Sequence, residues 1–279
     1  MRLMMVKTPE GDALGVVEGD GVAILPGRTL REVCGGGEAA LKAVAAAAAA
    51  APKVPRASVK AAQPVLNPGK FICIGLNFTD HAKEGGNPIP DYPALFLRVP
   101  SSLIADGEPM VCPKASPTFD YEAELTIVIG KGGRHIPEDK ALEAVFGYTI
   151  FNDGSVRAYQ RKSTQWTAGK NFDATGPIGP EVVTCDELPD GAHGLAVRSI
   201  LNGKVMQDGN TSDFIFSVAK VVSTLSEIMT LEPGDMIATG TPAGVGYPRK
   251  PPVFMKAGDE IVIEIEGIGR LTNPIVDEA

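Results

Sequence analysis

The chain has 279 residues and a net charge of −8, and 44% of its residues are hydrophobic against 22% that are charged. This is the composition of a globular protein with room for one large core, or for one core and a small appendage. The acidic balance excludes an electrostatic nucleic-acid surface, because no cluster of Lys and Arg interleaved with aromatics interrupts it.

Neither a membrane role nor a disulfide framework is indicated. The longest apolar run, Ala43 to Ala51, is far shorter than the roughly 18 residues that a membrane span needs. The cysteines are widely spaced, form no CxxC pair and follow no secretory signal, which favours reduced thiols and a cytoplasmic location. They are Cys34, Cys73, Cys112 and Cys185.

The first part of the chain is typical of a small α/β module. Met1 to Val6 and Gly15 to Leu25 predict short strands broken by turns, and the alanine-rich stretch Glu38 to Ala51 has a high intrinsic helix propensity. Several prolines then punctuate the chain before the next apolar strand. We therefore expect an N-terminal module of residues 1–66, followed by a catalytic domain of residues 67–279.

The main domain is predicted to be a strand-rich α+β fold, a curled and mostly antiparallel β-roll. Asn202-Gly203 separates two apolar runs and predicts a tight hairpin, whose two central residues need positive φ. Helices are expected at Glu138 to Phe146 and at Phe214 to Met229. No dinucleotide-binding or P-loop motif occurs. Strands are predicted at Lys70–Ile74, Glu124–Ile129, Tyr148–Phe151, Val197–Leu201, Met236–Thr239 and Ile261–Ile265.

Two carboxylates, Glu122 and Glu124, occupy alternate positions at the start of an apolar strand and so project from the same face. Taken alone, such a pair is more often the polar alternation of a solvent-facing edge strand. Here a second apolar strand ends at Asn152-Asp153 and delivers a third carboxylate. Three acids that converge in a core raise one another's pKa unless a cation lies among them. Such oxygen ligands suit Mg²⁺, with Mn²⁺ or Ca²⁺ as alternatives.

A polar run follows the third carboxylate. It contains Arg157, Gln160 and Lys170, which could supply the positive charge and hydrogen bonds that an anionic substrate requires. Each of the three, taken alone, is typical of a solvated surface residue. Their place directly after the acidic residues favours a role in binding.

His81 and Glu84 lie three residues apart and are therefore adjacent on a helical turn. Two glycines follow them and could act as a hinge. A lone histidine more often has a structural role than a catalytic one. Of the three histidines, however, His81 alone has a carboxylate at a spacing that orients an imidazole as a general base.

The chain resembles the fumarylacetoacetate hydrolase superfamily over roughly residues 70 to 275, and within it the branch of acylpyruvases and 2-hydroxyhepta-2,4-diene-1,7-dioate isomerases. Six stretches carry the resemblance in the family's order: GLNFTDHAKE, DYEAELTIVIGK, GYTIFNDGSVRAYQ, WTAGKNFDATGPIGP, LNGKVMQDGNTSDFIF and LEPGDMIATGTPAGVG. The resemblance implies a mixed β-sandwich roll with a small N-terminal domain. It also implies a homodimer and a small 2-oxo acid substrate from aromatic catabolism.

The resemblance further implies a role for each candidate site residue. The metal ligands would be Glu122, Glu124 and Asp153. His81 and Glu84 would be a water-activating pair on a mobile lid, and Lys170 would be an active-site lysine. The substrate contacts would include Arg157, Gln160 and Thr241.

The sequence departs from the family's pattern at three positions. Phe78 stands where a Tyr is usual, Arg98 where a Lys is usual, and Ala158 where an Asp is frequent. We expect Arg98 to lie near the substrate entrance, where a planar guanidinium and a point charge bind carboxylates differently. We expect these departures to affect which substrate the protein binds, and not which class of reaction it catalyses.

A metal that chelates the carboxylate and the 2-oxo oxygen of a substrate stabilises an enolate, and three reactions reach such a state. They are hydrolysis of an acylpyruvate, decarboxylation of oxaloacetate, and proton movement by an isomerase. We favour hydrolysis of a C–C bond, because decarboxylation requires no activated water and a complete His and Glu pair is present.

Two alternatives from other classes are weaker. A non-catalytic module holding a structural Ca²⁺ would make His81 and Lys170 unnecessary. A cysteine nucleophile is disfavoured, because Cys73 and Cys112 have no basic partner nearby in the sequence.

Overall fold

The structure, a computed structural model, describes residues 1–279. Its strands form two large sheets and one separate pair. The larger sheet contains β1 (Arg2–Thr8), β2 (Gly11–Glu18), β3 (Gly21–Leu25), β4 (Lys53–Pro55), β5 (Ala61–Ala62), β6 (Phe71–Gly75), β7 (Ala94–Leu97), β8 (Leu103–Ala105), β11 (Ala123–Ile129), β12 (Val145–Asn152), β14 (Gly176–Thr184) and β17 (Met236–Ala238). The second sheet contains β9 (Met110–Cys112), β15 (Ala196–Leu201), β16 (Lys204–Asn210), β18 (Glu260–Ile265) and β19 (Gly269–Asp277). The pair is β10 (Phe119–Asp120) and β13 (Ser155–Val156).

Both large sheets are mixed but mainly antiparallel. The larger one has the strand order β4-β3-β2-β1-β14-β12-β11-β17-β6-β7, with β5 beside β1 and β8 beside β14. The second has the order β16-β15-β18-β19-β9. Only β6 with β17, β8 with β14, and β9 with β19 run parallel. The predicted strand-rich, mostly antiparallel α+β fold is therefore confirmed.

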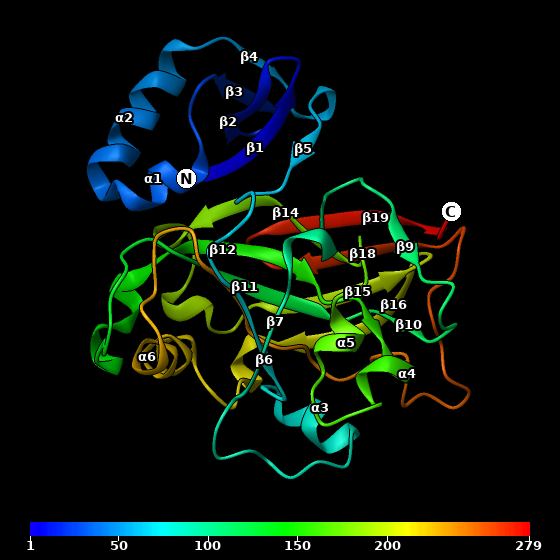
Figure 1. Ribbon diagram of the computed structural model, residues 1–279. Coiled ribbons are helices and arrows are strands. Elements are labelled where there is room, and N and C mark those ends of the chain that lie inside the picture. The colour runs from blue at the N-terminus through cyan, green and yellow to red at the C-terminus, as the bar shows by residue number, and fades with distance from the viewer.

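The central strands of the larger sheet are buried on both faces, and β11 shows how. Leu125 and Ile127 enter the core that the five-stranded sheet covers, whereas Val128 enters the core against the N-terminal module. Figure 1 shows the five-stranded sheet alongside β11, β12 and β14. Because side chains alternate along a strand, Glu124 projects from the same face as Val128.

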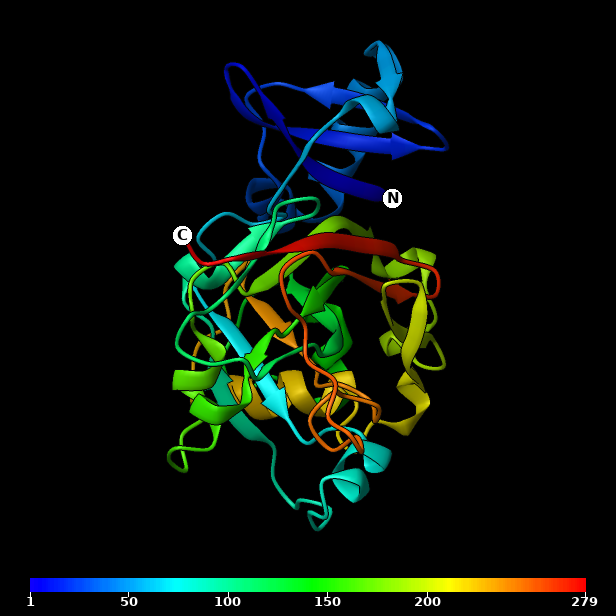
Figure 2. The same ribbon diagram turned by 90° about the vertical axis from the view of Figure 1, so that its right-hand side faces the viewer.

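The N-terminal module contains the predicted strands and helix. Its helices are α1 (Leu30–Gly35) and α2 (Gly37–Ala50), and a capping box between Thr29 and Glu32 begins the first. β1 pairs with β14 through Arg2 and Val183, so the module extends the larger sheet. Figure 2 shows it as a separate layer at one end of the molecule. The predicted boundary near residue 66 stays a prediction.

The remaining helical segments are short except for one. The α-helices are α3 (Thr79–Glu84), α4 (Arg157–Gln160), α5 (Thr167–Lys170) and α6 (Val218–Ile228). The 3₁₀ segments are Arg56–Ser58, Pro100–Ser102, Glu138–Ala144, Cys185–Glu187, Asp190–Ala192 and Thr211–Asp213.

Both helix predictions in the main domain need correction. The segment from Glu138 is a 3₁₀ helix that ends at Ala144, because Val145 already pairs with Ile129 in the sheet. The later helix begins at Val218 rather than Phe214, since the Ser217 side chain accepts a hydrogen bond from the Lys220 N–H and caps the first turn.

The predicted hairpin is confirmed, with β15 and β16 joined by Asn202 at φ 50° and Gly203 at φ 79°. None of the helices has the length and apolar character needed to cross a membrane. The four cysteines are unpaired.

Candidate active site

A cavity of about 670 Å³ is lined by residues of α3 and by residues at the start of β11. Figures 1 and 2 place α3 at the end of the molecule opposite the N-terminal module. Asp153 is fully buried and lies behind the cavity wall. The other predicted site residues all line the cavity: His81, Glu84, Glu122, Glu124, Arg157, Gln160, Lys170 and Thr241.

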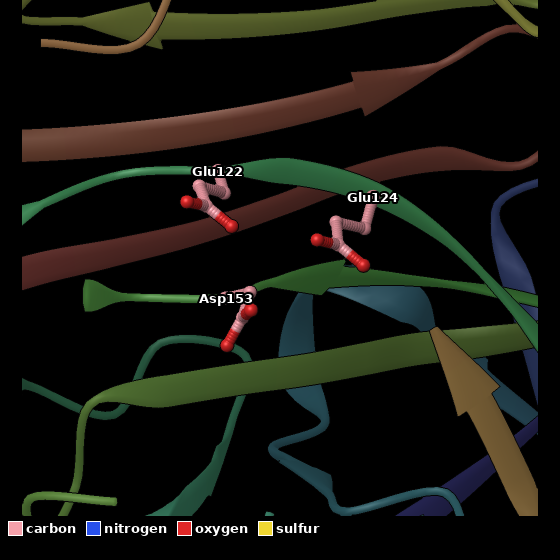
Figure 3. Close-up of side chains that lie close together, drawn as sticks. All are labelled: Glu122, Glu124 and Asp153. Atoms are coloured by element: carbon pink, nitrogen blue, oxygen red, sulfur yellow. The ribbon is translucent and has the colours of Figure 1, made fainter. Parts of the chain in front are cut away.

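Backbone pairing between β11 and β12 brings the three predicted ligands together. Ala123 pairs with Asn152, whose side-chain oxygen accepts a hydrogen bond from the Glu122 N–H at 3.0 Å. The Asp153 N–H in turn donates to the Glu122 carbonyl at 3.0 Å. One oxygen from each of Glu122, Glu124 and Asp153 lies within 4.8 Å of the others, and Figure 3 shows the three side chains close together.

Buried cations pair with two of these carboxylates. The Lys170 ammonium donates to Glu122 at 2.7 Å and to Asp153 at 2.6 Å. Arg157 lies 2.6 Å from the other oxygen of Glu122, and Arg98 lies 2.9 Å from the other oxygen of Asp153. Burial opposes ionisation of Glu122, but the charges of Lys170 and Arg157 outweigh it and lower its pKa to about 2.

Lys170 is held in its charged form. Burial disfavours the ammonium, yet the carboxylates of Asp153 and Glu122 outweigh this effect and raise the lysine pKa. An ammonium has three donor hydrogens, of which these two carboxylates take two. The third remains for a molecule in the cavity, which Lys170 lines.

Glu124 is the one carboxylate of the cluster without a cationic partner. One of its oxygens accepts a hydrogen bond from the Gly240 N–H at 3.0 Å, and the other accepts none. Burial and the charges of Asp153 and Glu122 raise its pKa well above the ordinary value. A buried carboxylate with a free oxygen beside two others is the donor set that a hard divalent cation requires, so the cluster fits such an ion.

His81 and Glu84 contact each other on α3. The His81 Nδ1 lies 3.3 Å from one oxygen of Glu84, whose other oxygen accepts a hydrogen bond from the Gly244 N–H at 2.9 Å. Because this carboxylate is an acceptor on both sides, Nδ1 carries the proton and donates it, which leaves Nε2 as the basic nitrogen. Asp80, which directly precedes His81, accepts a hydrogen bond from the Ala243 N–H at 3.2 Å.

Arg157 and Gln160 form one unit with a residue that sequence reasoning missed. Gln160 accepts a hydrogen bond from Arg157 at 2.9 Å, and the buried Asp120 accepts one from the same guanidinium at 2.8 Å. Asp120 also accepts the N–H groups of Gly246 and Tyr247. The only signal for Asp120 was its position in the motif that contains Glu122, because its partners lie far away in the sequence.

Thr241 is oriented by Gln207, a second residue that sequence reasoning missed. The Gln207 side-chain oxygen accepts a hydrogen bond from the Ala123 N–H, so its amide nitrogen must be the donor to Thr241 at 2.7 Å and to the Pro242 carbonyl at 2.8 Å. The Thr241 oxygen therefore acts as an acceptor toward Gln207. Its own hydrogen is left for a group in the cavity.

The sequence suggested that Arg98 lies near a substrate entrance, and this expectation is wrong. Its side chain is fully buried behind Asp153, where the guanidinium also donates to the Ser102 hydroxyl and the Thr175 hydroxyl. It lies 5.5 Å from the centre of the Phe151 ring. A planar donor fork fits this enclosed set of acceptors, so the departure from Lys affects the support of Asp153 and not the entrance.

Proteins of known structure and curated relatives resemble the chain along its whole length. It is 40% identical over 291 aligned residues, 99% of this chain and 92% of the relative, to oxaloacetate tautomerase FAHD2A of Homo sapiens. The 2-hydroxyhepta-2,4-diene-1,7-dioate isomerase of Mycobacterium marinum is 32% identical with a TM-score of 0.79, covering 100% and 99% of the two chains. Maleylpyruvate hydrolase of Sphingobium sp. SYK-6, in complex with manganese and pyruvate, is 31% identical with a TM-score of 0.84 over 100% of each chain.

These relatives contradict the predicted cytoplasmic location. The similar tautomerases of Homo sapiens, Xenopus laevis and Bos taurus are mitochondrial proteins. The prediction was drawn from the wide spacing of the cysteines, and reduced thiols indicate a reducing environment without specifying which compartment provides it.

The family model described as fumarylacetoacetate hydrolase, C-terminal, matches residues 70–276. This range contains both sheets' central strands and every residue of the candidate site. The resemblance drawn from the six sequence stretches is thereby confirmed, as is the expected family fold. The chain belongs to the fumarylacetoacetate hydrolase family of enzymes.

Proposed function

We propose that this enzyme is a divalent-metal-dependent isomerase that moves a proton between C3 and the 2-oxo oxygen of a small 2-oxo dicarboxylic acid, with oxaloacetate as the first candidate. Support comes from the near full-length similarity to oxaloacetate tautomerase FAHD2A and from the similarity to a dienedioate isomerase. The single observation that carries the proposal is the His81 and Glu84 pair facing the carboxylate cluster across one cavity.

The cluster of Glu122, Glu124 and Asp153 would hold the ion, with Mg²⁺ or Mn²⁺ as the expected metal. When bound, a divalent cation supplies a Lewis acid that stabilises negative charge on the 2-oxo oxygen. Lys170 directs its remaining hydrogen to an anionic oxygen of the substrate. The paired carboxylates keep this lysine charged, so it acts as a hydrogen-bond donor and not as a base.

His81 would carry the proton. Its Nε2 takes the proton from C3 of the keto form, and the resulting imidazolium, which Glu84 stabilises, gives that proton to the 2-oxo oxygen to complete the enol. The same nitrogen returns the proton in the reverse direction. Glu84 is fixed for this task by the Gly244 N–H, which keeps its carboxylate oriented toward the imidazole. A non-catalytic calcium site would need neither side chain.

Hydrolysis of a C–C bond is the second candidate. The same imidazole can take a proton from water, which then attacks a carbonyl beyond C3. The similarity to maleylpyruvate hydrolase, whose structure contains manganese and pyruvate, favours this reaction for the same set of residues. Both candidates share the cation site and His81, and they differ in whether a C–C bond breaks.

The deciding experiment separates the products. The purified chain, loaded with Mg²⁺ or Mn²⁺, is given oxaloacetate and, in a parallel reaction, an acylpyruvate. Loss of the enol absorbance, pyruvate formation and CO₂ release are followed independently. We expect catalysed enol–keto conversion of oxaloacetate without pyruvate or CO₂. Pyruvate formed in step with acylpyruvate consumption, with no acceleration of tautomerisation, would favour the hydrolase and contradict the isomerase.

A further inference from the structure

The basic side chains that line the cavity differ in how they are paired with carboxylates. Lys170 contacts two carboxylates, Arg157 is paired with Asp120 and Glu122, and His81 contacts Glu84. Arg161 also lines the cavity, but it forms no ion pair and its side chain makes no hydrogen bond. It is therefore the only cation of the cavity whose charge is uncompensated.

The place of Arg161 is defined by the helix before it. Its N–H donates to the Arg157 carbonyl at 3.2 Å, so the two arginines lie one helical turn apart on the same side of α4. The Arg161 guanidinium lies 4.7 Å from the centre of the Tyr247 ring, which supports it by a cation–π contact.

Tyr247 is itself held close to the site. Its N–H donates at 2.9 Å to Asp120, the carboxylate that also accepts from Arg157. Asp120 thus connects the support of Arg161 with the wall of the carboxylate cluster. Arg161 therefore has a defined position relative to the carboxylate cluster, although its side chain is exposed.

We infer that Arg161 binds the second carboxylate of the substrate and makes the enzyme selective for dicarboxylic over monocarboxylic 2-oxo acids. The first carboxylate and the 2-oxo oxygen belong at the cluster with Lys170. A second carboxylate at the far side of the cavity meets the one free guanidinium, whose planar fork matches a carboxylate. This inference rests on the proposed function in taking 2-oxo acids as the ligands.

Two acids of equal length provide the test, 2-oxopentanedioate and 2-oxopentanoate, which differ only in the terminal carboxylate. Their dissociation constants for the Mg²⁺-loaded chain are measured by titration calorimetry, for the unchanged protein and for Arg161→Gln. Lys162→Gln is the matched control, because this neighbouring cation lies 3.6 Å from the Tyr159 ring and does not line the cavity.

We expect the unchanged protein to prefer the diacid, and Arg161→Gln to weaken diacid binding roughly fivefold, which is the upper range for an exposed ion pair. Binding of the monoacid and of Mg²⁺ should be unchanged, and Lys162→Gln should preserve the preference. Added salt should reduce the preference of the unchanged protein.

Several results would overturn the role of Arg161: an equal loss for both acids, an equal effect of Lys162→Gln, no preference in the unchanged protein, or no binding of either acid. The proposed function is checked separately by C3 proton exchange. A diacid preference that depends on Arg161, without any exchange, would contradict the isomerase and leave the assignment of Arg161 intact.

Discussion

Glu124 differs from the two other carboxylates of the cluster in what surrounds it. Glu122 and Asp153 are each bound by two cationic side chains, whereas Glu124 has a single backbone N–H. Three carboxylates at alternate and facing positions could be predicted from the sequence. Their separate charge partners could not, since Arg98 reaches Asp153 across 55 positions of the chain.

This difference predicts opposite effects on stability within one cluster. In metal-free protein, Glu124→Gln should leave the melting temperature unchanged or raise it, because it replaces a buried carboxyl group whose ionisation no cation supports. Asp153→Asn should lower stability by about 3–5 kcal/mol, because it leaves Arg98 buried without a carboxylate partner and leaves Lys170 with Glu122 alone. Thermal melts in EDTA measure both. Equal destabilisation by the two variants would contradict the assignment of charges.

His81 is predicted to act in proton transfer and not in metal binding. His81→Gln should lower turnover by about 10²- to 10⁴-fold, the usual worth of a general base, while the affinity for Mg²⁺ is unchanged. Glu84→Gln should have a smaller effect of the same kind, since it orients the imidazole through Nδ1. Steady-state kinetics and metal titrations on the same preparations give both quantities. Loss of metal binding in His81→Gln would contradict this prediction and would show that the carboxylate cluster depends on α3 to bind the ion.

At the scale of elements, three segments that are far apart in the sequence are joined through one side chain. Gln207 of β16 accepts a hydrogen bond from Ala123, the first residue of β11, and donates to Thr241 and Pro242 after β17. The alternation of side chains along a strand predicted that the two glutamates share a face. The Asn202-Gly203 pair predicted the hairpin turn that precedes β16. Neither pattern indicates that β16 supports β11, because that contact depends on how the two sheets pack.

Gln207→Leu should affect both the fold and substrate binding. The buried N–H of Ala123 would lose its acceptor, which costs about 1–3 kcal/mol, and Thr241 would lose its orientation. We expect a lower melting temperature and a raised KM with a smaller change in kcat. Thr241→Val should raise KM with a smaller loss of stability, because one Gln207 hydrogen loses its acceptor while the other keeps the Pro242 carbonyl, and Thr241→Ser should retain binding. A kcat effect larger than the KM effect would argue against this role of Gln207.

At the scale of the whole molecule, the larger sheet ends at β7 with apolar surface. Leu97 on that strand is 53% exposed, and Val99 just beyond it is 43% exposed. Exposed edge strands of this kind are commonly covered by a partner. Together with the family resemblance, this surface keeps the homodimer as our prediction. The compartment, by contrast, could not be read from cysteine spacing.

Sedimentation at micromolar concentration tests the homodimer. We expect the mass of two chains, and a double change of Leu97→Lys and Val99→Lys should shift it toward one chain if β7 contributes to the interface. Matched changes at Val205, which is 50% exposed on β16, serve as the control. A single-chain mass for the unchanged protein would contradict the prediction.

We expect C3 proton transfer to require a divalent ion held by the carboxylate cluster. The direct measurement is exchange of the C3 hydrogens of oxaloacetate in D₂O, followed by ¹H NMR during titration of chelator-treated protein with Mg²⁺ or Mn²⁺. We predict that catalysed exchange is absent after chelation, returns in proportion to the bound metal, and is lost in Glu124→Gln together with calorimetric metal binding. Full exchange in metal-free protein, or an unchanged metal affinity in Glu124→Gln, would contradict it.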